Sequence, residues 1–309
     1  MVQTEERLTG EVPAPVAPSL GAFSVKDWLL LAATALTWGS SFVWIEIGLE
    51  AFSPTFITLL RLVFGAGTLV FVRQARAPIA REDLPAIALL GLVWMAAPLL
   101  LFPIAQQWIA SSLAGMINGS MPIFAGVIAA VVLRRLPPSK TMLGIALGFI
   151  GVVAVSWPAV QGSSATALGA GLVLAATICY GIAVNLAVPL QQKYGTLPII
   201  LRAQLFALAI TFVPGIIGAT SSSFDAASLA AMIPLGCLGT GLAFVWMGTL
   251  VGRVGAARGS VTIYFVPVIA IMMGALFRSE SIAVISIVGT ALVLAGAFIT
   301  SRTQTRERA

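Results

Sequence analysis

The chain has 309 residues, of which 59% are hydrophobic and 9% are charged, and its mean hydropathy is +1.03. A soluble domain needs about a quarter of its residues charged to cover its surface, so this composition excludes a water-soluble fold and leaves lipid as the solvent. The net charge of +6 fits membrane orientation better than a nucleic-acid partner, and the lack of histidine removes the commonest general base and metal ligand.

Apolar stretches of about twenty residues follow one another along the chain, each long enough to cross a bilayer as a helix. Backbone groups in lipid must pair within the protein, and these stretches are continuous rather than alternating, so helices are predicted and not a barrel. The predicted spans are 27–46, 54–72, 84–106, 110–133, 141–158, 168–189, 198–218, 228–251, 256–277 and 282–300. Residues 1–25, which are polar and proline-rich, are predicted to be a disordered cytoplasmic tail, and residues 302–309 a second tail.

Positive charge gathers on one side of the predicted bundle. If the N-terminus is cytoplasmic, every Lys and Arg in a connecting segment lies on the inner side except Arg278, while Arg61 and Arg202 lie within spans. Cytoplasmic segments carry the excess of positive residues in membrane proteins, so both termini are expected in the cytoplasm. The tail has no transit-peptide pattern, which favours a bacterial inner membrane.

The two halves of the chain repeat part of their glycine and proline pattern. The pairs at a shift of 145 residues are Gly91 with Gly236, Pro122 with Pro267, Gly144 with Gly289 and Gly151 with Gly296, and a slightly smaller shift places Arg61 near Arg202. Each half, 26–160 and 161–301, holds five spans, and because five is odd the second half enters the membrane from the opposite side. We therefore predict an all-α membrane protein whose ten transmembrane helices form two inverted five-helix repeats, an architecture typical of alternating-access transporters with a site near mid-membrane.

Short motifs occur in order along these spans. They are Trp38-Gly39-Ser40-Ser41-Phe42 in the first span, Pro54 followed by Arg61 in the second, Met121-Pro122-Ile123-Phe124 in the fourth and Val266-Pro267-Val268 in the ninth, with Glu280 after it. In this order the chain resembles the drug/metabolite transporter superfamily, in particular its ten-helix EamA-type members, over nearly all of its length after the tail. Arg134 and Arg135 stand where that family often has Gly-Glu, so only one half keeps the acid that could help close a gate. The resemblance implies transport of small organic metabolites, and amino-acid exporters are prominent in the family.

Ionisable residues within spans are costly and mark functional sites. Arg61 and Arg202 are candidates to bind a substrate carboxylate, because the planar guanidinium holds both of its oxygens. The alternative is that each extends to the nearer interface or ties helices together. No Asp, Glu or His is predicted at mid-membrane, and Glu46 and Glu50 lie at the outer end of the first span. Facilitated diffusion is therefore favoured, and proton coupling through Glu46 is the less favoured reading.

Aromatic and amide side chains complete the candidate pocket. The predicted substrate-binding residues are Trp38, Ser41, Arg61, Trp94, Asn118, Tyr180, Asn185, Arg202, Trp246 and Tyr264. Such a pocket holds amphipathic solutes with broad selectivity, although the tryptophans also suit lipid-facing packing. Pro122 and Pro267 are predicted to form paired kinks that gate the cavity. Glycine pairs such as Gly144/Gly148, Gly248/Gly252 and Gly255/Gly259 are predicted to let helices approach closely.

The predicted function is an alternating-access transporter of small organic metabolites, an exporter or facilitator of aromatic and other apolar amino acids without proton coupling. A proton-coupled multidrug efflux pump is the alternative. An intramembrane enzyme is not expected, because the spans contain neither paired aspartates nor histidine, and no catalytic residue, metal or cofactor is predicted. The expected partners are a small-molecule solute and the lipid bilayer, with no nucleic acid, and the oligomeric state stays open, a monomer being one option.

Overall fold

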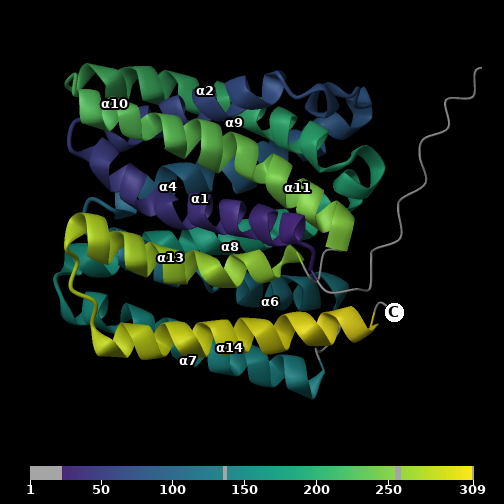
Figure 1. Ribbon diagram of the computed structural model, residues 1–309, viewed down its shortest axis with the longest axis vertical. Helices are drawn as coiled ribbons and strands as arrows, with labels where there is room; N and C mark the ends of the chain where they lie inside the picture. Colours follow the sequence, from purple (N-terminus) through teal and green to yellow (C-terminus); the bar gives the residue numbers. More distant parts are fainter. Residues whose placement is uncertain (1–22, 135–137, 255–258, 308–309) are drawn as a thin grey trace, which may run out of the picture.

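The computed structural model describes residues 23–134, 138–254 and 259–307, and over these residues its regular secondary structure consists of helices alone (Figure 1). Eight of its helices are long and apolar enough to cross a membrane, and two shorter apolar helices, Pro54–Val70 and Val284–Ile299, complete the set. Each predicted span coincides with one of these ten, so the ten-helix membrane fold is confirmed. Most of the predicted tail 1–25, together with Arg135 and Gly255, lies outside the described residues.

Seven crossings are single helices and three are interrupted. The single helices are α1 (Val25–Leu49), α2 (Pro54–Val70), α7 (Ser139–Gln161), α8 (Ser164–Tyr194), α9 (Thr196–Thr220), α13 (Val261–Arg278) and α14 (Val284–Glu307). The interrupted ones are α3 (Leu84–Leu90) with the π-helix η3 (Gly91–Ala96) and α4 (Ala97–Ala105), α5 (Ser111–Asn118) with α6 (Met121–Leu133), and α10 (Ala226–Ile233) with the π-helix η4 (Pro234–Leu242) and α11 (Ala243–Val254). Two short 3₁₀ turns, η1 (Arg73–Arg76) and η2 (Arg81–Asp83), join α2 to α3. The last helix, α14, extends past the predicted span end at residue 300 into the predicted second tail.

Local sequence signals fix several helix starts. Ser24 and Asp27 form a reciprocal capping box at α1, and the Ser53 side chain caps α2, which begins at Pro54. Between α8 and α9 the chain turns at a single residue, Gly195, whose φ of 80° lies in the left-handed region that favours glycine. These signals fix the residues at which helices begin and end, which the hydrophobic stretches alone do not define.

The outer pairs of the bundle join equivalent helices of the two halves. Helix α7 packs along α14 at one edge and α2 along α9 at the other (Figure 1). A Cβ atom on Gly151 would lie 2.6 Å from the backbone nitrogen of Val293, and one on Gly296 would lie 2.5 Å from the carbonyl oxygen of Gly144. The close approach predicted for Gly144/Gly148 is therefore confirmed. The prediction for Gly248/Gly252 is wrong, because within 23–134, 138–254 and 259–307 a Cβ on Gly252 would meet no atom within 4 Å.

The two halves share irregularities at equivalent positions. The π-helices η3 and η4 contain Gly91 and Gly236, one of the glycine pairs that repeat along the chain. Gly91 lies against α9, where a Cβ would come within 2.8 Å of the Ala203 carbonyl oxygen, and Gly236 lies against Phe64 of α2. Each π-helix therefore packs on the second crossing of the opposite half. Similarly, α6 and α13 each end in a left-handed residue, Arg134 and Ser279, which are related by the same shift.

The even number of crossings brings both chain ends to one end of the bundle, which we call the terminal end; it lies on the right in Figure 1. The opposite end, which we call the Arg278 end, carries the turns 50–53, 106–110, 162–163, 221–225 and 279–283. These two ends would face the two aqueous phases on either side of the bilayer.

Candidate functional site

A buried arginine lies near the middle of α2. Arg61 is only 7% exposed, and its Nε donates a hydrogen bond to Thr240 Oγ1 of η4 at 2.7 Å. Among the described residues, no carboxylate lies within ion-pair distance of its guanidinium. A charge held in a low-dielectric interior without a counter-ion costs several kcal/mol. A negatively charged group that reached Arg61 would therefore be bound firmly.

The position of Arg61 depends on Thr240. The Thr240 hydroxyl donates to the carbonyl oxygen of Leu235, five residues earlier, and accepts from Arg61, so it bridges the wide turn of the π-helix and the guanidinium. Gln204 of α9 donates through Nε2 to the Thr240 carbonyl oxygen at 2.6 Å, and Trp38 of α1 donates through Nε1 to the neighbouring Gly239 carbonyl oxygen at 3.1 Å. Helices α1, α2 and α9 therefore all hold residues 239–240.

Aromatic rings gather at the same depth. Phe244 of α11 makes edge-to-face contacts with Trp38 and with Trp94 of η3, with ring centroids 5.6 and 6.0 Å apart. Tyr180 of α8 packs against Phe102, with ring centroids 6.0 Å apart. The rings of Trp38, Trp94, Tyr180 and Phe244 are only half-buried. Together they give an apolar surface beside a single unpaired cation.

Ser41 lies at the edge of this region, and the other two predicted residues named below lie away from it. Ser41 is buried and donates to the carbonyl oxygen of Thr37 in its own helix, and its oxygen lies near Gly239. Asn118, at the end of α5, has a buried side-chain oxygen that accepts no hydrogen bond from the described part of the chain. Trp246 follows Phe244 by two positions on α11, so its side chain points to a different face of that helix.

Three further predicted residues connect helices. Asn185 of α8 donates to the Ala125 carbonyl oxygen of α6 at 3.0 Å, and the Tyr264 hydroxyl of α13 donates to the Ala297 carbonyl oxygen of α14 at 3.1 Å. Arg202 donates to the carbonyl oxygens of Ala75 and Ala77, the latter at 2.8 Å, and so fixes η1 at the terminal end. The equivalent arginines of the two halves therefore have different surroundings, and only Arg61 lies at mid-depth.

The two prolines predicted to act in gating differ in their local structure. Pro122 lies in the first turn of α6, directly after a break in the fourth crossing at residues 119–120, whereas α13 continues without a break through Pro267. Pro267 is buried against Gly119, where a Cβ would meet its ring. Both prolines therefore lie close to the place where α5 packs against α13. Their role in gating stays a prediction.

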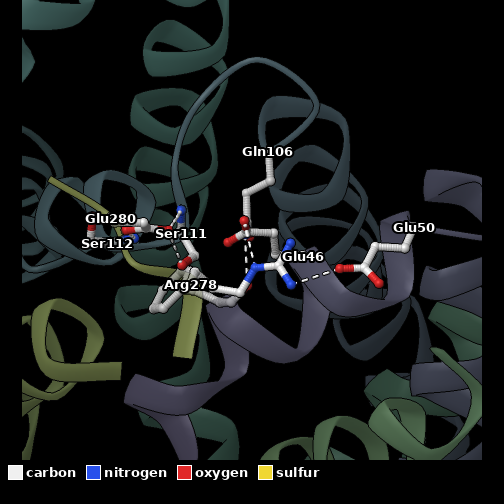
Figure 2. A network of polar contacts seen from close by, with 8 residues as sticks. Glu46, Glu50, Gln106, Ser111, Ser112, Arg278 and Glu280 are labelled. Carbon is white, nitrogen blue, oxygen red and sulfur yellow. Dashed lines mark hydrogen bonds and ion pairs between the residues drawn. The ribbon is translucent and has the colours of Figure 1, made fainter. Parts of the chain in front are cut away.

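Charged and polar side chains join several helices at the Arg278 end (Figure 2). Arg278 donates through Nε to Glu46 Oε1 at 2.9 Å and through Nη1 to Glu50 Oε1 at 2.6 Å, which ties α13 to α1. Glu280 accepts hydrogen bonds from Ser111 N at 2.9 Å, Ser111 Oγ at 2.5 Å and Ser112 N at 3.0 Å, at the start of α5. We call these residues, with Gln106, the Arg278 network.

Glu280 lies outside the membrane-spanning segments and stays ionised in this network. Burial raises the pKa of its carboxyl, but the hydrogen bonds from Ser111 and Ser112 outweigh that effect and hold the pKa below its ordinary value. The carboxylate also lies at the N-terminus of α5, where negative charge is stabilised. The acid that the family resemblance singled out therefore caps a helix rather than pairing with a cation.

A cavity of about 540 Å³ opens at the terminal end, between η1, the start of α9 and α11. Its lining includes Gln74, Tyr194, Thr196 and Thr249. Beside it, Lys193 forms an ion pair with Asp83 at 2.8 Å, and the Tyr194 hydroxyl donates to the same carboxylate. A cavity thus opens on one side of the terminal end, while the Arg278 network joins α13 to α1 and to the start of α5 at the other end.

Sequence reasoning missed several residues of these two regions. Thr240, Gln204 and Phe244 carry no charge and no distinctive motif, so only their three-dimensional neighbours reveal them. Gln106 is likewise the last residue of a predicted span, 84–106, and its sequence context gave no signal of a role. Glu46, Glu50 and Arg278 were expected at one side of the bundle, but nothing in the chain indicated that they pair.

The chain is similar to known transporters over most of its length. The model of the EamA-like transporter family matches it twice, at residues 26–157 and 167–302. A probable terminal-alkyne amino-acid exporter of Streptantibioticus cattleyicolor is 29% identical, covering 88% of this chain and 92% of that protein. A probable amino-acid metabolite efflux pump of Escherichia coli is 23% identical, covering 89% and 95%.

Two further comparisons extend this similarity. An uncharacterized transporter of Archaeoglobus fulgidus is 26% identical, covering 90% of this chain and 99% of that protein. A solved crystal structure superposes with a TM-score of 0.64 at 17% sequence identity, covering 92% of this chain and 99% of that chain. At that identity the superposition shows the shared fold alone.

Proposed function

Because this chain belongs to the EamA-like transporter family of the drug/metabolite transporter superfamily, we propose that it exports amino acids, chiefly aromatic and other apolar ones, as a facilitator without proton coupling. It is a multi-pass membrane transporter. The similarity to proteins named as amino-acid exporters and efflux pumps supports the choice of solute.

The proposal places the terminal end in the cytoplasm of a bacterial cell and the Arg278 end outside the inner membrane. Lys and Arg residues of the described chain gather at the terminal end, among them Arg73, Arg76, Arg81 and Lys140, whereas the opposite end has Arg278. Cytoplasmic segments hold such excess positive charge. In this orientation the 540 Å³ cavity faces the cytoplasm.

The observation that carries the proposal is the unpaired guanidinium of Arg61 beside half-buried rings. An amino acid would place its carboxylate on the free edge of the guanidinium and its apolar side chain against Trp38, Trp94 or Phe244. The same arrangement would serve alternating access, because the side chains that contact the solute come from both halves of the chain. Arg61 and Trp38 belong to the first half, and Tyr180 and Phe244 belong to the second. No acid of the described residues lies beside Arg61 to relay protons, which supports facilitated transport.

The test is efflux of radiolabelled phenylalanine from proteoliposomes, with phenethylamine, which lacks the carboxylate, as the comparison solute. Arg61→Gln removes a charge-assisted hydrogen bond worth about 1.5–3 kcal/mol, so phenylalanine transport should fall about 10- to 100-fold while phenethylamine transport changes little. Arg202→Gln is the matched control, since it removes an arginine that binds only backbone carbonyls, and it should affect both solutes alike.

Two results would count against the proposal. Equal slowing of both solutes by Arg61→Gln would leave this residue a purely structural role. Efflux that stops entirely without a pH gradient would favour the alternative, a proton-coupled multidrug efflux pump.

A further inference from the structure

A groove of about 280 Å³ lies where α1 meets the π-helix η4 and α13, and it shares no lining residue with the site around Arg61. Its lining residues are Leu36, Thr37, Ser40, Trp44, Pro234, Leu238 and Met273. Leu36 is 55% exposed and Leu238 is 37% exposed, so the groove opens on the outer surface of the bundle. In a membrane-spanning helix bundle this surface faces lipid, and the groove is therefore continuous with the interface between protein and bilayer.

Two close contacts of α1 shape the groove. Trp38 fastens α1 to the Gly239 carbonyl oxygen of η4, and Gly39 lets α13 approach, since a Cβ on Gly39 would lie 2.6 Å from Cβ of Ile269. Figure 1 shows α1 between α13 on one side and α10 and α11 on the other. The lining residues that α1 contributes include 36, 40 and 44, which follow one another at a spacing of four and form one stripe of the helix. The groove therefore runs along α1, with one wall from the first half of the chain and two from the second.

The groove lies at the depth of a single leaflet. Trp44 precedes the end of α1 at Leu49 by five residues, and Met273 precedes the end of α13 at Arg278 by five, so both lie about 8 Å from the Arg278 end. Leu36 precedes Leu49 by thirteen residues and lies about 20 Å from the same end. The groove is therefore about 12 Å long, and the hydrocarbon of one leaflet is about 15 Å thick.

The polar side chains of the groove are satisfied within α1. The Thr37 hydroxyl donates to the Ala33 carbonyl oxygen, the Ser40 hydroxyl to the Thr37 carbonyl oxygen, and the Trp44 indole N–H to the Ser40 hydroxyl oxygen. The other lining side chains are apolar, namely Leu36, Pro234, Leu238 and Met273. Water in a cavity needs two to four polar partners, and the charged groups of an amino acid would be left unpaired here. The groove thus favours an apolar occupant.

We propose that the groove binds one acyl chain of a phospholipid from the leaflet at the Arg278 end. A cavity of about 150 Å³ holds a benzene molecule, so 280 Å³ has room for about ten carbon atoms of the chain. The chain enters beside Trp44 and Met273, with its headgroup at the Arg278 end, and reaches Leu36 and Leu238 toward mid-membrane. Packing drives this binding, because the chain is already in hydrocarbon and an unfilled groove would lose the dispersion contacts of its lining atoms. The inference requires only the membrane-spanning fold and is independent of the proposed solute.

Photo-crosslinking tests the site on the full chain in detergent. The purified protein is titrated, at constant detergent, with phosphatidylethanolamine that carries a diazirine at the end of one acyl chain, and the labelled residues are identified by mass spectrometry. Labelling around Leu36 and Leu238 should saturate at one lipid per protein. Labelling of Phe212, an exposed residue of α9, should instead rise in proportion to the amount of probe. A second probe, with the diazirine near the ester, should label Trp44 and Met273.

Substitutions on two walls of the groove should exclude the chain. Leu238→Trp and Met273→Trp each enlarge a lining side chain, so the saturable labelling at Leu36 should fall about tenfold or more. Leu205→Trp is the matched control, because Leu205 is 44% exposed on α9 and does not line the groove; this variant should keep the saturable labelling. Melting temperatures in the same detergent identify the variants that fold as the parent does, and either groove variant is sufficient for the test.

Four outcomes would overturn the proposal. They are labelling at Leu36 that rises without saturation, saturable labelling that persists in a folded groove variant, labelling of Leu36 by the probe with the diazirine near the ester, and displacement of the lipid by excess phenylalanine. The last result would make the groove part of the solute path. A failure of phenylalanine efflux in proteoliposomes would refute the proposed solute and would leave the lipid site unaffected.

Discussion

The cap that Glu280 places on α5 gives a prediction whose size follows from its contacts. Glu280→Gln keeps the volume of the side chain but removes its charge, and the new amide N–H₂ would face the Ser112 N–H, a donor against a donor. A hydrogen bond to a charged group contributes about 1.5–3 kcal/mol, and a negative charge at a helix N-terminus about 0.3–1 kcal/mol. The expected loss of stability is therefore about 2–4 kcal/mol.

Thermal unfolding in detergent, followed by circular dichroism, measures this loss. The melting temperature should fall by about 5 °C or more at neutral pH. Glu82→Gln is the matched control: its side chain is 77% exposed and lies 3.6 Å from Lys193, so this change should shift the melting temperature by less than about 1 °C.

The pH dependence gives the sign of the effect. Because the pKa of Glu280 is lower in the folded protein than its ordinary value of 4.5, the carboxylate contributes its full stabilisation above pH 4.5. That contribution is lost as the pH falls through the folded pKa. The difference between the parent and Glu280→Gln should therefore be constant near neutral pH and shrink in strong acid. Equal melting of the two proteins at neutral pH would refute the reasoning, as would a difference that persists undiminished in strong acid.

Three other changes follow from the packing and the hydrogen bonds. Gly151→Ala places a methyl group against the backbone of α14 and should cost about 1–3 kcal/mol in thermal unfolding, whereas Gly171→Ala, which has open space around it, should cost nothing. Trp38→Phe keeps the ring beside Phe244 but loses the bond to η4, so phenylalanine efflux should fall several-fold with the melting temperature little changed. Thr240→Val removes the acceptor of Arg61 and should raise KM for phenylalanine about tenfold, and Thr240→Ser should restore it; an unchanged KM would contradict that role.

The fold followed closely from the sequence because lipid imposes a simple rule on it. Continuous apolar stretches bounded by charge can only be helices, so the ten spans coincide with the ten helices. The glycine pairs were also informative where two helices touch directly, as Gly151 and Gly296 do between α7 and α14. A glycine has several possible uses, however, and no atom of the described residues packs against Gly252.

The site was harder to predict, because its chemistry depends on neighbours that are distant in the chain. Arg61 and Arg202 occupy similar places in the two halves, but only the fold shows that one meets a lone hydroxyl and the other a row of backbone carbonyls. The π-helices were equally hidden: the match of Gly91 with Gly236 marks the place but does not encode an extra residue in the turn. Uncharged residues such as Gln106 carry no signal in the sequence. Only the structure shows that its side-chain oxygen, Oε1, is buried and accepts no hydrogen bond from the described residues.

Three helices are hydrogen-bonded to residues 239–240 of η4, and this affects any attempt to change the solute selectivity of the protein. Trp38, Arg61 and Gln204 all fasten the same two residues, so a library that randomises those positions would mix changes in solute preference with changes in helix assembly. Trp94 makes a ring contact with Phe244 and packs against the neighbouring apolar core, and in the described part of the chain its side chain makes no hydrogen bond to these two residues. It is the position from which an engineered variant could accept bulkier cargo while leaving the scaffold intact.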